Sequence, residues 1–475
     1  MPKLRGLPLV EIAGPRAFPL VDPTRSVLRF LADPLDSLLE LSARYGSIAA
    51  VSDRHAELVC AFGATLNHEV LTQPAAFEHD SALPFSAPKG SAFERFNRAM
   101  IFMNGDDHKR VRRLLAPAFQ KSALDGYADS IVSMATLELD RWHTGSAYDV
   151  AHALRELTLR VAMRCLFGVD IGASTEQLGT LAARQLECLA SPLTVVLPAA
   201  IPGLPYHELV ATCERLEQRM RALIAARRAS SNNATDALSL LLSASGGEAG
   251  LSDDELIGQM NTLFVAGHET TATTLAWTLL LLARHPSVLD ALTTEIDEVL
   301  GDREPSPSVL DAMPALDAVV KESLRLLPSA PVLFTRVLSR EARLGPHTLP
   351  AGAGVVLSPL VTHRDPSVFA RPKAFVPERW KHEQPTTYEY VPFGAGARMC
   401  LGAGFANLAL RLLLPMVLRR FSFVLDAEQV VRAHVRGITM APRGGIRARV
   451  ERRSRGDRAA RQRVKPGPMD ALVEW

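Results

Sequence analysis

A single cysteine within a glycine-rich stretch is the residue whose setting is best suited to chemistry. Residues 393–402 read Phe-Gly-Ala-Gly-Ala-Arg-Met-Cys-Leu-Gly, and Cys400 stands directly before an apolar run typical of a buried helix. The glycines let the backbone bend tightly and lie against a flat object that a Cβ would hold away. At a helix N-terminus, free N–H groups and the helix dipole stabilise a thiolate. Cys400 is therefore predicted to be a metal ligand.

The spacing of the other four cysteines limits which metal Cys400 could bind. Cys60, Cys165, Cys188 and Cys213 are scattered, and no Cys-x-x-Cys pair occurs. A structural zinc site uses about four ligands at paired spacings, so this pattern argues against zinc. Scattered cysteines also argue against a disulfide framework and fit a reducing compartment. One axial thiolate indicates haem iron, and an inert buried cysteine on a glycine loop is the alternative.

This stretch resembles the signature of the cytochrome P450 family, Phe-x-x-Gly-x-Arg-x-Cys-x-Gly. The matching residues are Phe393, Gly396, Arg398, Cys400 and Gly402. The resemblance implies haem b (iron protoporphyrin IX) as the cofactor, with Cys400 as the axial ligand of its iron. It also implies that Phe393, Gly396 and Arg398 contact the haem. The resemblance covers most of residues 30–450.

A long helix is predicted to carry a second group of reactive residues. Ser252-Asp-Asp-Glu255 forms a capping box, and an unbroken helical pattern follows to Arg284. In its middle, Ala266-Gly-His-Glu-Thr-Thr contains a glycine and two threonines, which lower helix propensity. Ala266 and Thr270 are one turn apart and share a face. A tight crossing of two helices is one explanation of this composition.

The resemblance to the family supplies the other explanation, because this segment is similar to its oxygen-activating helix. It implies that Glu269 and Thr270 are the catalytic acid and alcohol, Glu269 bringing protons from solvent and Thr270 donating a hydrogen bond where oxygen binds. It further implies that Ala266 lies against the haem. His268 stands at a variable position and is not expected to be a ligand.

A helix with a strongly basic first half is predicted from residue 108. His108 and Arg112 are four residues apart, so they share one face, where two donors could hold a carboxylate. The resemblance implies that both bind a haem propionate, with Arg336 and Arg398 as further partners.

The other basic residues of this helix are Lys109, Arg110 and Arg113. They face elsewhere and are candidates for docking an acidic electron donor. The alternative is an ordinary solvated face, since runs of charge on a helix usually are one.

Glu322-Ser-Leu-Arg325 is a third motif. Alone, a Glu and an Arg three residues apart would be an ordinary surface pair. The segment Phe375-Val-Pro-Glu-Arg-Trp follows at the distance typical of the family, and there the resemblance implies that Arg379 joins the pair. We interpret Glu322, Arg325 and Arg379 as structural residues.

The elements that position these residues belong to a mainly α protein. Helical periods dominate the chain, and short β-like runs interrupt them. The resemblance implies a single large helical domain with small β-sheets, the cytochrome P450 fold, over residues 26–450. Residues 1–25 are expected to form a proline-rich segment, and residues 451–475 a basic, disordered tail.

Charge and hydropathy exclude other classes of protein. The 53 Lys and Arg residues nearly balance the 51 Asp and Glu residues, which argues against a nucleic-acid partner. Prolines and charges break the N-terminus before any apolar run reaches spanning length, so no membrane anchor is expected. These features suggest a soluble enzyme of bacterial type that is cytoplasmic and monomeric.

The expected reaction inserts one oxygen atom from O2 into a lipophilic small molecule, by hydroxylation or epoxidation. A fatty acid, terpenoid, steroid or polyketide would suit a mostly apolar pocket. The residues predicted to line it are Phe85, Leu263, Ala266, Val332, Leu333 and Ile438.

Electrons are expected from a ferredoxin or flavodoxin with its reductase, because the haem domain leaves no room for a flavin or nicotinamide domain. Two alternatives are kept. A peroxygenase would use hydrogen peroxide directly, but such relatives usually lose the acid and alcohol that Glu269 and Thr270 provide. The other alternative is a haem-binding protein without catalytic activity.

Overall fold

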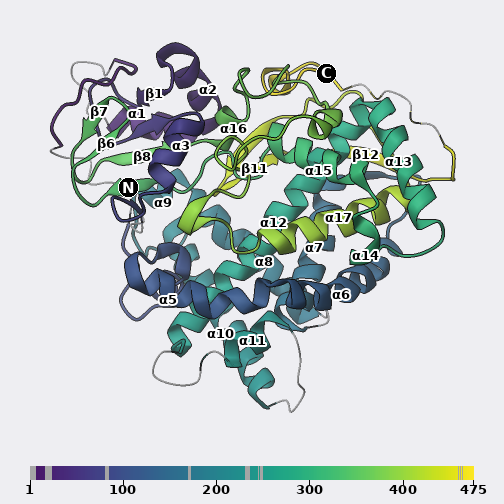
Figure 1. The fold of residues 1–475 in the computed structure, drawn as a ribbon. Coiled ribbons are helices and arrows are strands. Elements are labelled where there is room, and N and C mark those ends of the chain that lie inside the picture. The colour runs from purple at the N-terminus through teal and green to yellow at the C-terminus, as the bar shows by residue number, and fades with distance from the viewer. Residues whose placement is uncertain are drawn as a thin grey trace.

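A large helical body and a smaller lobe rich in β-strands make up the chain (Figure 1). The computed structural model describes residues 7–16, 24–80, 85–169, 173–229, 236–243, 245, 250–457, 459, 462 and 464–475. About 54% of the chain is helical, which confirms the predicted mainly α class with small β-sheets. Within the described residues, no helix is long and apolar enough to cross a membrane.

The helical body draws on nearly the whole chain. The helices before the central one are α1 (Thr24–Ala32), α2 (Pro34–Tyr45), α3 (Ala64–Leu71), α4 (Ala92–Phe96), α5 (Gly105–Leu115), α6 (Lys121–Leu139), α7 (Val150–Phe167), α8 (Ala173–Ala190), α9 (Pro192–Val196), α10 (Pro205–Ala229) and α11 (Ala237–Ser243). The central helix and its successors are α12 (Asp253–Arg284), α13 (Pro286–Leu300), α14 (Pro307–Leu310), α15 (Pro314–Leu326), α16 (Pro359–Thr362) and α17 (Ala403–Arg420).

The β-lobe is built on a five-stranded sheet in the order β1-β2-β8-β5-β3, in which only the β2–β8 pair is parallel. Its strands are β1 (Ile48–Ala50), β2 (Val59–Ala61), β3 (Phe77–His79), β5 (Arg336–Leu338) and β8 (Gly354–Leu357). The remaining strands are β4 (Ala147–Asp149), β6 (Ala342–Leu344), β7 (His347–Leu349), β9 (Phe421–Leu425), β10 (Ala433–Arg436), β11 (Thr439–Pro442) and β12 (Arg447–Arg452).

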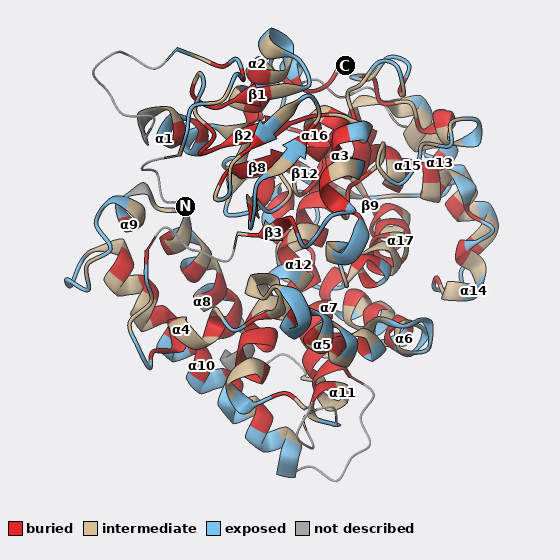
Figure 2. Cartoon of the chain, turned by 60° about the vertical axis from the view of Figure 1, so that its left-hand side comes forward, coloured by how far each residue is buried: buried red, intermediate tan, exposed pale blue. Residues whose placement is uncertain are grey.

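α12 runs through the middle of the helical body. Its predicted capping box is confirmed, because Ser252 Oγ accepts from the Glu255 N–H and the Glu255 carboxylate accepts from the Ser252 N–H. From Thr271 to Ala283 every residue is buried, as the red ribbon of α12 in Figure 2 indicates. A helix that is covered on all sides lies in the core, so α12 is a fixed support for residues 266–270.

The C-terminal tail differs from the expectation of disorder. Within the part that spans residues 464–475, Met469, Leu472 and Val473 are buried in the main hydrophobic core. The Arg364 guanidinium donates to the Leu472 carbonyl at 2.7 Å. The prediction was wrong for this part because it weighed the basic residues and overlooked the apolar residues that follow them.

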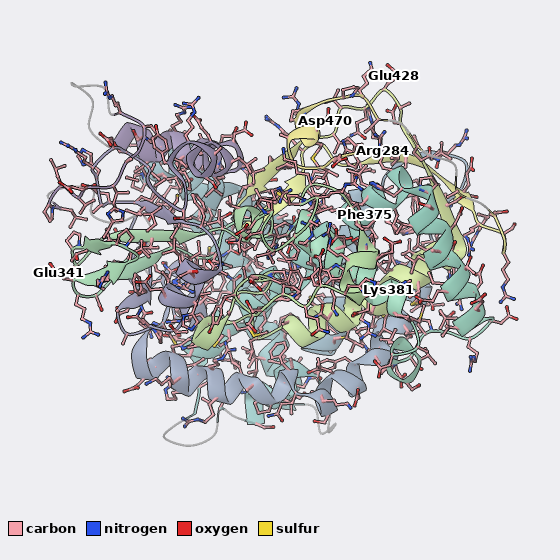
Figure 3. All side chains as sticks on the ribbon, turned by 45° about the horizontal axis from the view of Figure 1, so that its top comes forward. Arg284, Glu341, Phe375, Lys381, Glu428 and Asp470 are labelled. Carbon is pink, nitrogen blue, oxygen red and sulfur yellow. The ribbon has the colours of Figure 1, made fainter. Side chains whose placement is uncertain are left out.

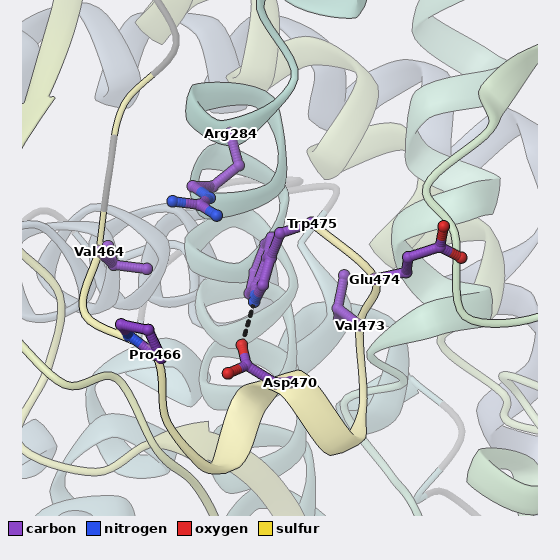
Figure 4. Close-up of a pocket in the computed structure, with 7 residues that line it drawn as sticks. All are labelled: Arg284, Val464, Pro466, Asp470, Val473, Glu474 and Trp475. Atoms are coloured by element: carbon purple, nitrogen blue, oxygen red, sulfur yellow. Dashed lines mark hydrogen bonds between the residues drawn. The ribbon is translucent and has the colours of Figure 1, made fainter.

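Trp475, the last residue of this segment, makes contacts of its own at one side of the molecule. Its indole N–H donates to Asp470 at 2.8 Å, and the Arg284 guanidinium lies 4.9 Å from the ring centroid (Figure 4). A cavity of about 360 Å³ opens between these residues, and none of the predicted site residues lines it. Figure 3 shows Arg284 and Asp470 far from Glu341, which precedes the β6–β7 hairpin.

The described part of the N-terminal segment, residues 7–16, runs along the β-lobe. Leu9 forms a β-bridge with His55, and the Ile12 side chain is buried. The other residues predicted for this segment, 1–6 and 17–23, lie outside the described residues, while Thr24 already begins α1.

Candidate active site

The loop that carries Cys400 is closed by its own backbone before α17 begins. The Cys400 N–H donates to the Phe393 carbonyl at 2.8 Å, and Gly402 is the N-cap residue of α17. Gly396 has a φ of +68°, and a Cβ there would collide with the carbonyl oxygen of Leu71 at the end of α3. Glycine at 396 is thus required by a left-handed turn and by packing against α3.

Cys400 differs from the other cysteines of the chain. Its side chain is exposed, whereas the other four are buried. Dense surrounding protein raises the pKa of the Cys400 thiol, while a hydrogen bond from the Gly402 N–H and the charge of Arg112 oppose that rise. Burial raises the pKa of Cys60 with no such opposition. Cys400 is therefore the one cysteine that combines access with groups that stabilise a thiolate.

A cationic cluster lies beside this loop, made of His108 and Arg112 from α5, Arg336 from β5, and Arg398 from the loop itself. Burial and the charge of Arg398 lower the pKa of Arg336 to about 10. Burial and the charge of Arg112 lower the pKa of Arg398 to about 10. Burial and all three arginines lower the pKa of His108 to about 4. The fold thus brings the four predicted carboxylate-binding residues together, where they repel one another.

Two further residues of this region escaped the sequence analysis. His79 pairs with Arg336 across strands β3 and β5, and burial together with nearby cations lowers its pKa to about 3. Asn104 Oδ1 accepts from the Arg398 guanidinium at 2.6 Å and from the His79 N–H at 3.0 Å. Only the pairing of strands far apart in sequence places His79 here, and no local pattern could have revealed it.

The predicted acid and alcohol are neighbours on α12 but have different partners. Thr270 Oγ1 donates to the Ala266 carbonyl at 2.9 Å, and Thr270 is half-buried while Ala266 is exposed. The buried Glu269 carboxylate accepts from Arg155 Nε on α7 at 3.1 Å. Thr270 and Ala266 therefore share an accessible face, and Glu269 is turned toward α7.

The residues predicted to line the pocket fall into separate groups. Ala266 and Ile438 are exposed, the latter at 38%. Leu263 is half-buried against the hydrophobic cluster of α7, α10 and α12, and Phe85 is buried within it. Phe85 makes an edge-on contact with Tyr206 at 5.8 Å between ring centroids. Phe85 is thus a core aromatic residue at the border of this region.

The segment before β5 presents a different residue from those predicted. Val332 and Leu333 pack against the two hydrophobic clusters of the β-lobe. Phe334 belongs to the segment predicted to pass beside the haem but was not named as a lining residue; it is 40% exposed, and its ring centroid lies 4.9 Å from that of His79. The contacts of Val332 and Leu333 with the β-lobe make Phe334 the better candidate for a pocket wall on this segment.

Glu322, Arg325 and Arg379 form the predicted ion-pair cluster, which we call the paired cluster. Arg325 donates two bonds to Glu322, at 2.8 and 2.9 Å, and Arg379 donates to the same carboxylate at 3.0 Å. Trp380 adds a further hydrogen bond to Glu322 at 3.0 Å. The Glu322 and Arg325 side chains are fully buried.

The basic residues predicted to dock a donor are partly engaged within the chain. Arg110 forms an ion pair with Glu255 at the start of α12. Lys109 is paired with Asp106 at 2.9 Å, on an exposed face where such pairs are weak. Arg113 is exposed. Lys109 and Arg113 are therefore more available to a partner than Arg110.

These residues fit a haem. An accessible thiol with a stabilising N–H group suits an axial thiolate, and the cationic cluster suits two carboxylates. Among the described residues, no group of three or more His, Cys, Asp or Glu side chains could hold a metal ion by itself. A metal held by Cys400 would therefore need a prosthetic group to complete its coordination.

Comparison with known proteins identifies the class. The sequence model of the cytochrome P450 family matches residues 13–446, so the chain belongs to the cytochrome P450 family. It is a haem-thiolate monooxygenase, an oxidoreductase that requires O2, a substrate and an electron-transfer partner. The sequence-based predictions of family, fold and reaction class are confirmed.

Bacterial relatives resemble the chain over most of its length. It is 36% identical to cyclooctatin synthase of Streptomyces melanosporofaciens over 332 residues, which cover 66% of this chain and 70% of the relative. It is 31% identical to cyclooctat-9-en-7-ol 5-monooxygenase of the same organism over 403 residues, or 82% and 84% of the two chains. The structure of retinoic acid-bound cyanobacterial CYP120A1 matches with a TM-score of 0.80 at 25% identity, covering 94% of this chain and all of the other.

Proposed function

We propose that this monooxygenase hydroxylates or epoxidises a lipophilic terpenoid, with haem b as its cofactor and Cys400 as the axial ligand. The observation that carries the proposal is the accessible Cys400 thiol beside the cationic cluster. A thiolate needs both access to iron and nearby groups that stabilise its charge, and this is the cysteine that has them.

The haem, when bound, supplies the activation of O2 at iron, and a thiolate ligand favours O–O cleavage. The chain's own residues hold the group and manage protons. Arg112, Arg336, Arg398 and His108 would bind and neutralise its carboxylates, which would otherwise be buried without partners. Phe393 and Gly396 support the loop that presents Cys400.

Proton supply is assigned to Glu269 and Thr270. Thr270 stands on the accessible face of α12, where its hydroxyl donates to the Ala266 carbonyl and can still accept a second hydrogen bond. Glu269 is buried behind that face and can exchange protons as a carboxylic acid. We assign Thr270 to hydrogen bonding at the position where oxygen binds. We assign Glu269 to supplying protons to that position from solvent.

The substrate class rests on two kinds of support. The candidate pocket residues Ala266, Ile438, Leu263 and Phe334 carry no charge, which favours a neutral, lipophilic molecule. The names of two relatives refer to cyclooctatin and cyclooctat-9-en-7-ol, and the second name is that of an unsaturated alcohol, so we choose a terpenoid alcohol as the first candidate among the four lipophilic classes.

Electrons would come from a ferredoxin or flavodoxin with its reductase. The exposed basic residues Lys109 and Arg113 on α5 suit an acidic donor. Five free cysteines fit a reducing compartment, and we place the enzyme in the cytoplasm.

Turnover with defined electron donors tests this proposal. A panel of terpenoid alcohols, fatty acids, steroids and polyketides is first screened for ligands that shift the haem spin state. The best ligand is then incubated with ¹⁸O2, NADPH, reductase and either ferredoxin or flavodoxin. We expect a terpenoid to gain one labelled oxygen atom. Product from hydrogen peroxide alone would indicate a peroxygenase, and no product under any condition would indicate a haem protein without catalysis.

A further inference from the structure

One turn of α12 carries two polar side chains that the chain itself leaves without partners. Asn261 is 8% exposed, and its buried Oδ1 atom accepts no hydrogen bond from any described residue. Thr262 is half-buried, and its accessible hydroxyl has no hydrogen-bond partner among the described residues either. Because buried polar groups in folded proteins are nearly always satisfied, we expect a polar group from outside the chain to reach this turn.

The other polar side chains on this part of α12 are engaged, which sets the turn apart. Before it, Gln259 accepts from the Met100 N–H at 2.9 Å. After it, His268 Nδ1 lies 2.7 Å from the Phe264 carbonyl, and the predicted acid and alcohol have the partners described above. Within residues 259–270, polar side chains without a partner therefore occur at positions 261 and 262 alone.

The Thr262 hydroxyl behaves differently from those of three other threonines on α12. Inside a helix, a threonine hydroxyl commonly donates to the carbonyl four residues before it. Thr270, Thr274 and Thr278 do so, at 2.9, 2.9 and 2.8 Å. Thr262 makes no such bond to the Gly258 carbonyl, so its hydroxyl is free to donate one hydrogen bond and to accept another.

The spacing along α12 places that hydroxyl on the accessible face. Residues four apart share a face, so Thr262, Ala266 and Thr270 form one stripe along the helix. At about 1.5 Å per residue, Thr262 lies about 6 Å from Ala266 and about 12 Å from Thr270 along the helix axis. One turn before Thr262 the helix is covered, because a Cβ at Gly258 would lie 2.9 Å from the Ala99 nitrogen. Thr262 is therefore the polar end of the stripe, opposite the end assigned to oxygen.

We propose that Thr262 is a specificity-determining residue whose hydroxyl binds a hydroxyl group that the substrate already carries. This inference rests on the proposed function and deepens it, because it narrows the lipophilic substrate to an alcohol. The candidate pocket residues carry no charge, so one contact between hydroxyl groups fixes the orientation of the substrate within apolar walls. An alcohol suits this turn better than a ketone or an ether, because an alcohol can also donate to an unpartnered acceptor.

The same spacing predicts where oxygen is inserted. With its hydroxyl group held at Thr262, the substrate presents to Ala266 and Thr270 a carbon that lies about 6–12 Å away along the helix. The inserted oxygen and the existing hydroxyl group are therefore several bonds apart in the product. The enzyme thus acts after a reaction that has already placed a hydroxyl group on the skeleton.

Matched compounds test the hydroxyl contact by binding alone. The shift of the haem spin state gives dissociation constants for the terpenoid alcohol selected by the screen, for the same skeleton without the hydroxyl group, and for the corresponding ketone. Thr262→Val removes the hydroxyl but keeps a β-branched side chain. We expect T262V to weaken binding of the alcohol about tenfold, as for the loss of one hydrogen bond, and to leave binding of the deoxy compound unchanged.

Two results of this binding experiment would overturn the proposal. One is a T262V enzyme that binds the alcohol as tightly as the wild type does. The other is a wild-type enzyme that binds the ketone as tightly as the alcohol, since a group that only accepts would then be sufficient.

Thr278→Val is the matched control. Thr278 is buried on the same helix, and its hydroxyl donates to the Thr274 carbonyl, so T278V removes a hydroxyl that no substrate can reach. T278V should leave the affinities for the alcohol and for the deoxy compound unchanged. If T278V weakened binding of the alcohol selectively, a general distortion of α12 would explain both variants and the proposal would fail.

The position of the inserted oxygen is the second readout. With ¹⁸O2, NADPH and the electron donor found above, the wild type should place one labelled oxygen atom at a single carbon remote from the hydroxyl group. T262V should spread the label over several carbons, because the substrate has lost its anchor. The same single product from T262V would contradict the role of Thr262.

The substrate class and the Thr262 contact are tested separately. If no terpenoid shifts the spin state of the wild type, the proposed substrate class is refuted, and pairs of alcohol and deoxy compound from the other three lipophilic classes test Thr262 instead. If the wild type oxidises a terpenoid and T262V binds both members of the pair as the wild type does, the proposed function stands and the inference about Thr262 is refuted.

Discussion

The paired cluster and the cationic cluster bury arginines under opposite conditions. In the paired cluster, Glu322 accepts from Arg325 and Arg379, and Arg325 donates its remaining hydrogens to three backbone carbonyls. In the cationic cluster, Arg336 donates to a backbone carbonyl, and the described residues place no carboxylate in an ion pair with Arg336 or Arg398.

This difference indicates that one cluster serves the fold and the other serves binding. Buried charges need partners, and the paired cluster supplies all of them from within the chain. The cationic cluster keeps an excess of positive charge beside Cys400, with the pKa of Arg336 and Arg398 both lowered to about 10. The paired cluster should therefore stabilise the fold, and the cationic cluster should favour an anionic group.

Arg325→Met is expected to have the largest effect. It leaves the Glu322 carboxylate fully buried with one cation fewer, and breaking a buried pair in this way costs about 3–5 kcal/mol. Chemical denaturation would measure the loss. Arg455→Met is the control, because Arg455 pairs with Asp302 on the surface and should change stability by less than about 0.5 kcal/mol. Similar losses of stability in both variants would show that the paired cluster contributes no more than a surface ion pair.

Leu472→Ala tests whether the packing of the C-terminal segment against the main hydrophobic core stabilises the fold. Leu472 is buried, and truncating a buried leucine costs about 2–5 kcal/mol. Haem affinity should stay unchanged, since Leu472 belongs to the main core and not to the cationic cluster. A thermal or denaturant midpoint equal to that of the wild type would show that the segment is not packed in solution.

Arg336→Met should weaken haem binding and leave stability unchanged, whereas Arg325→Met should lower stability. The haem-free protein should keep its stability, because a repelled cation is removed. The dissociation constant for haem should rise about 10- to 100-fold, as expected for losing one charged hydrogen bond of about 1.5–3 kcal/mol. Haem transfer to an acceptor protein measures this. Arg343→Met, at an exposed position of strand β6, is the control that should leave haem affinity unchanged.

The lowered pKa of His108 predicts a smaller effect, a dependence of the stability of the haem-free protein on pH. Its pKa is lowered from 6.5 to about 4 in the fold, chiefly by burial and then by the neighbouring arginines. The unfolded chain therefore binds this proton at higher pH than the folded chain. The contribution is complete above pH 6.5 and is lost as the pH falls toward about 4. His108→Asn should flatten the stability curve in that window, and an unchanged curve would contradict the assignment.

Local patterns predicted the parts of the molecule that depend on neighbours in sequence. The capping box at Ser252 and the helix that ends at Arg284 were predictable because their hydrogen bonds span only a few residues. Cys400 was recognisable from its glycines and from the helix that follows. The family resemblance then supplied the roles of residues such as Arg379, whose partner lies far away in sequence.

Tertiary contacts account for what the sequence analysis missed. His79 reaches Arg336 through strand pairing over more than 250 residues, and Arg155 reaches Glu269 only because α7 crosses α12. Val332 and Leu333 were chosen as lining residues instead of Phe334, because packing against the β-lobe decides which side chain of this short segment is exposed. None of these contacts leaves a periodic signal in the chain.

The absorption spectrum of the ferrous carbon monoxide complex tests the central claim most directly. The wild-type protein should give the absorption typical of a thiolate ligand, because Cys400 is the accessible cysteine with a stabilised thiolate. Cys400→Ser should abolish that signal, while Cys60→Ser, at a buried cysteine, should retain it. A thiolate-type spectrum that survives in Cys400→Ser would contradict the assignment of Cys400 as the axial ligand.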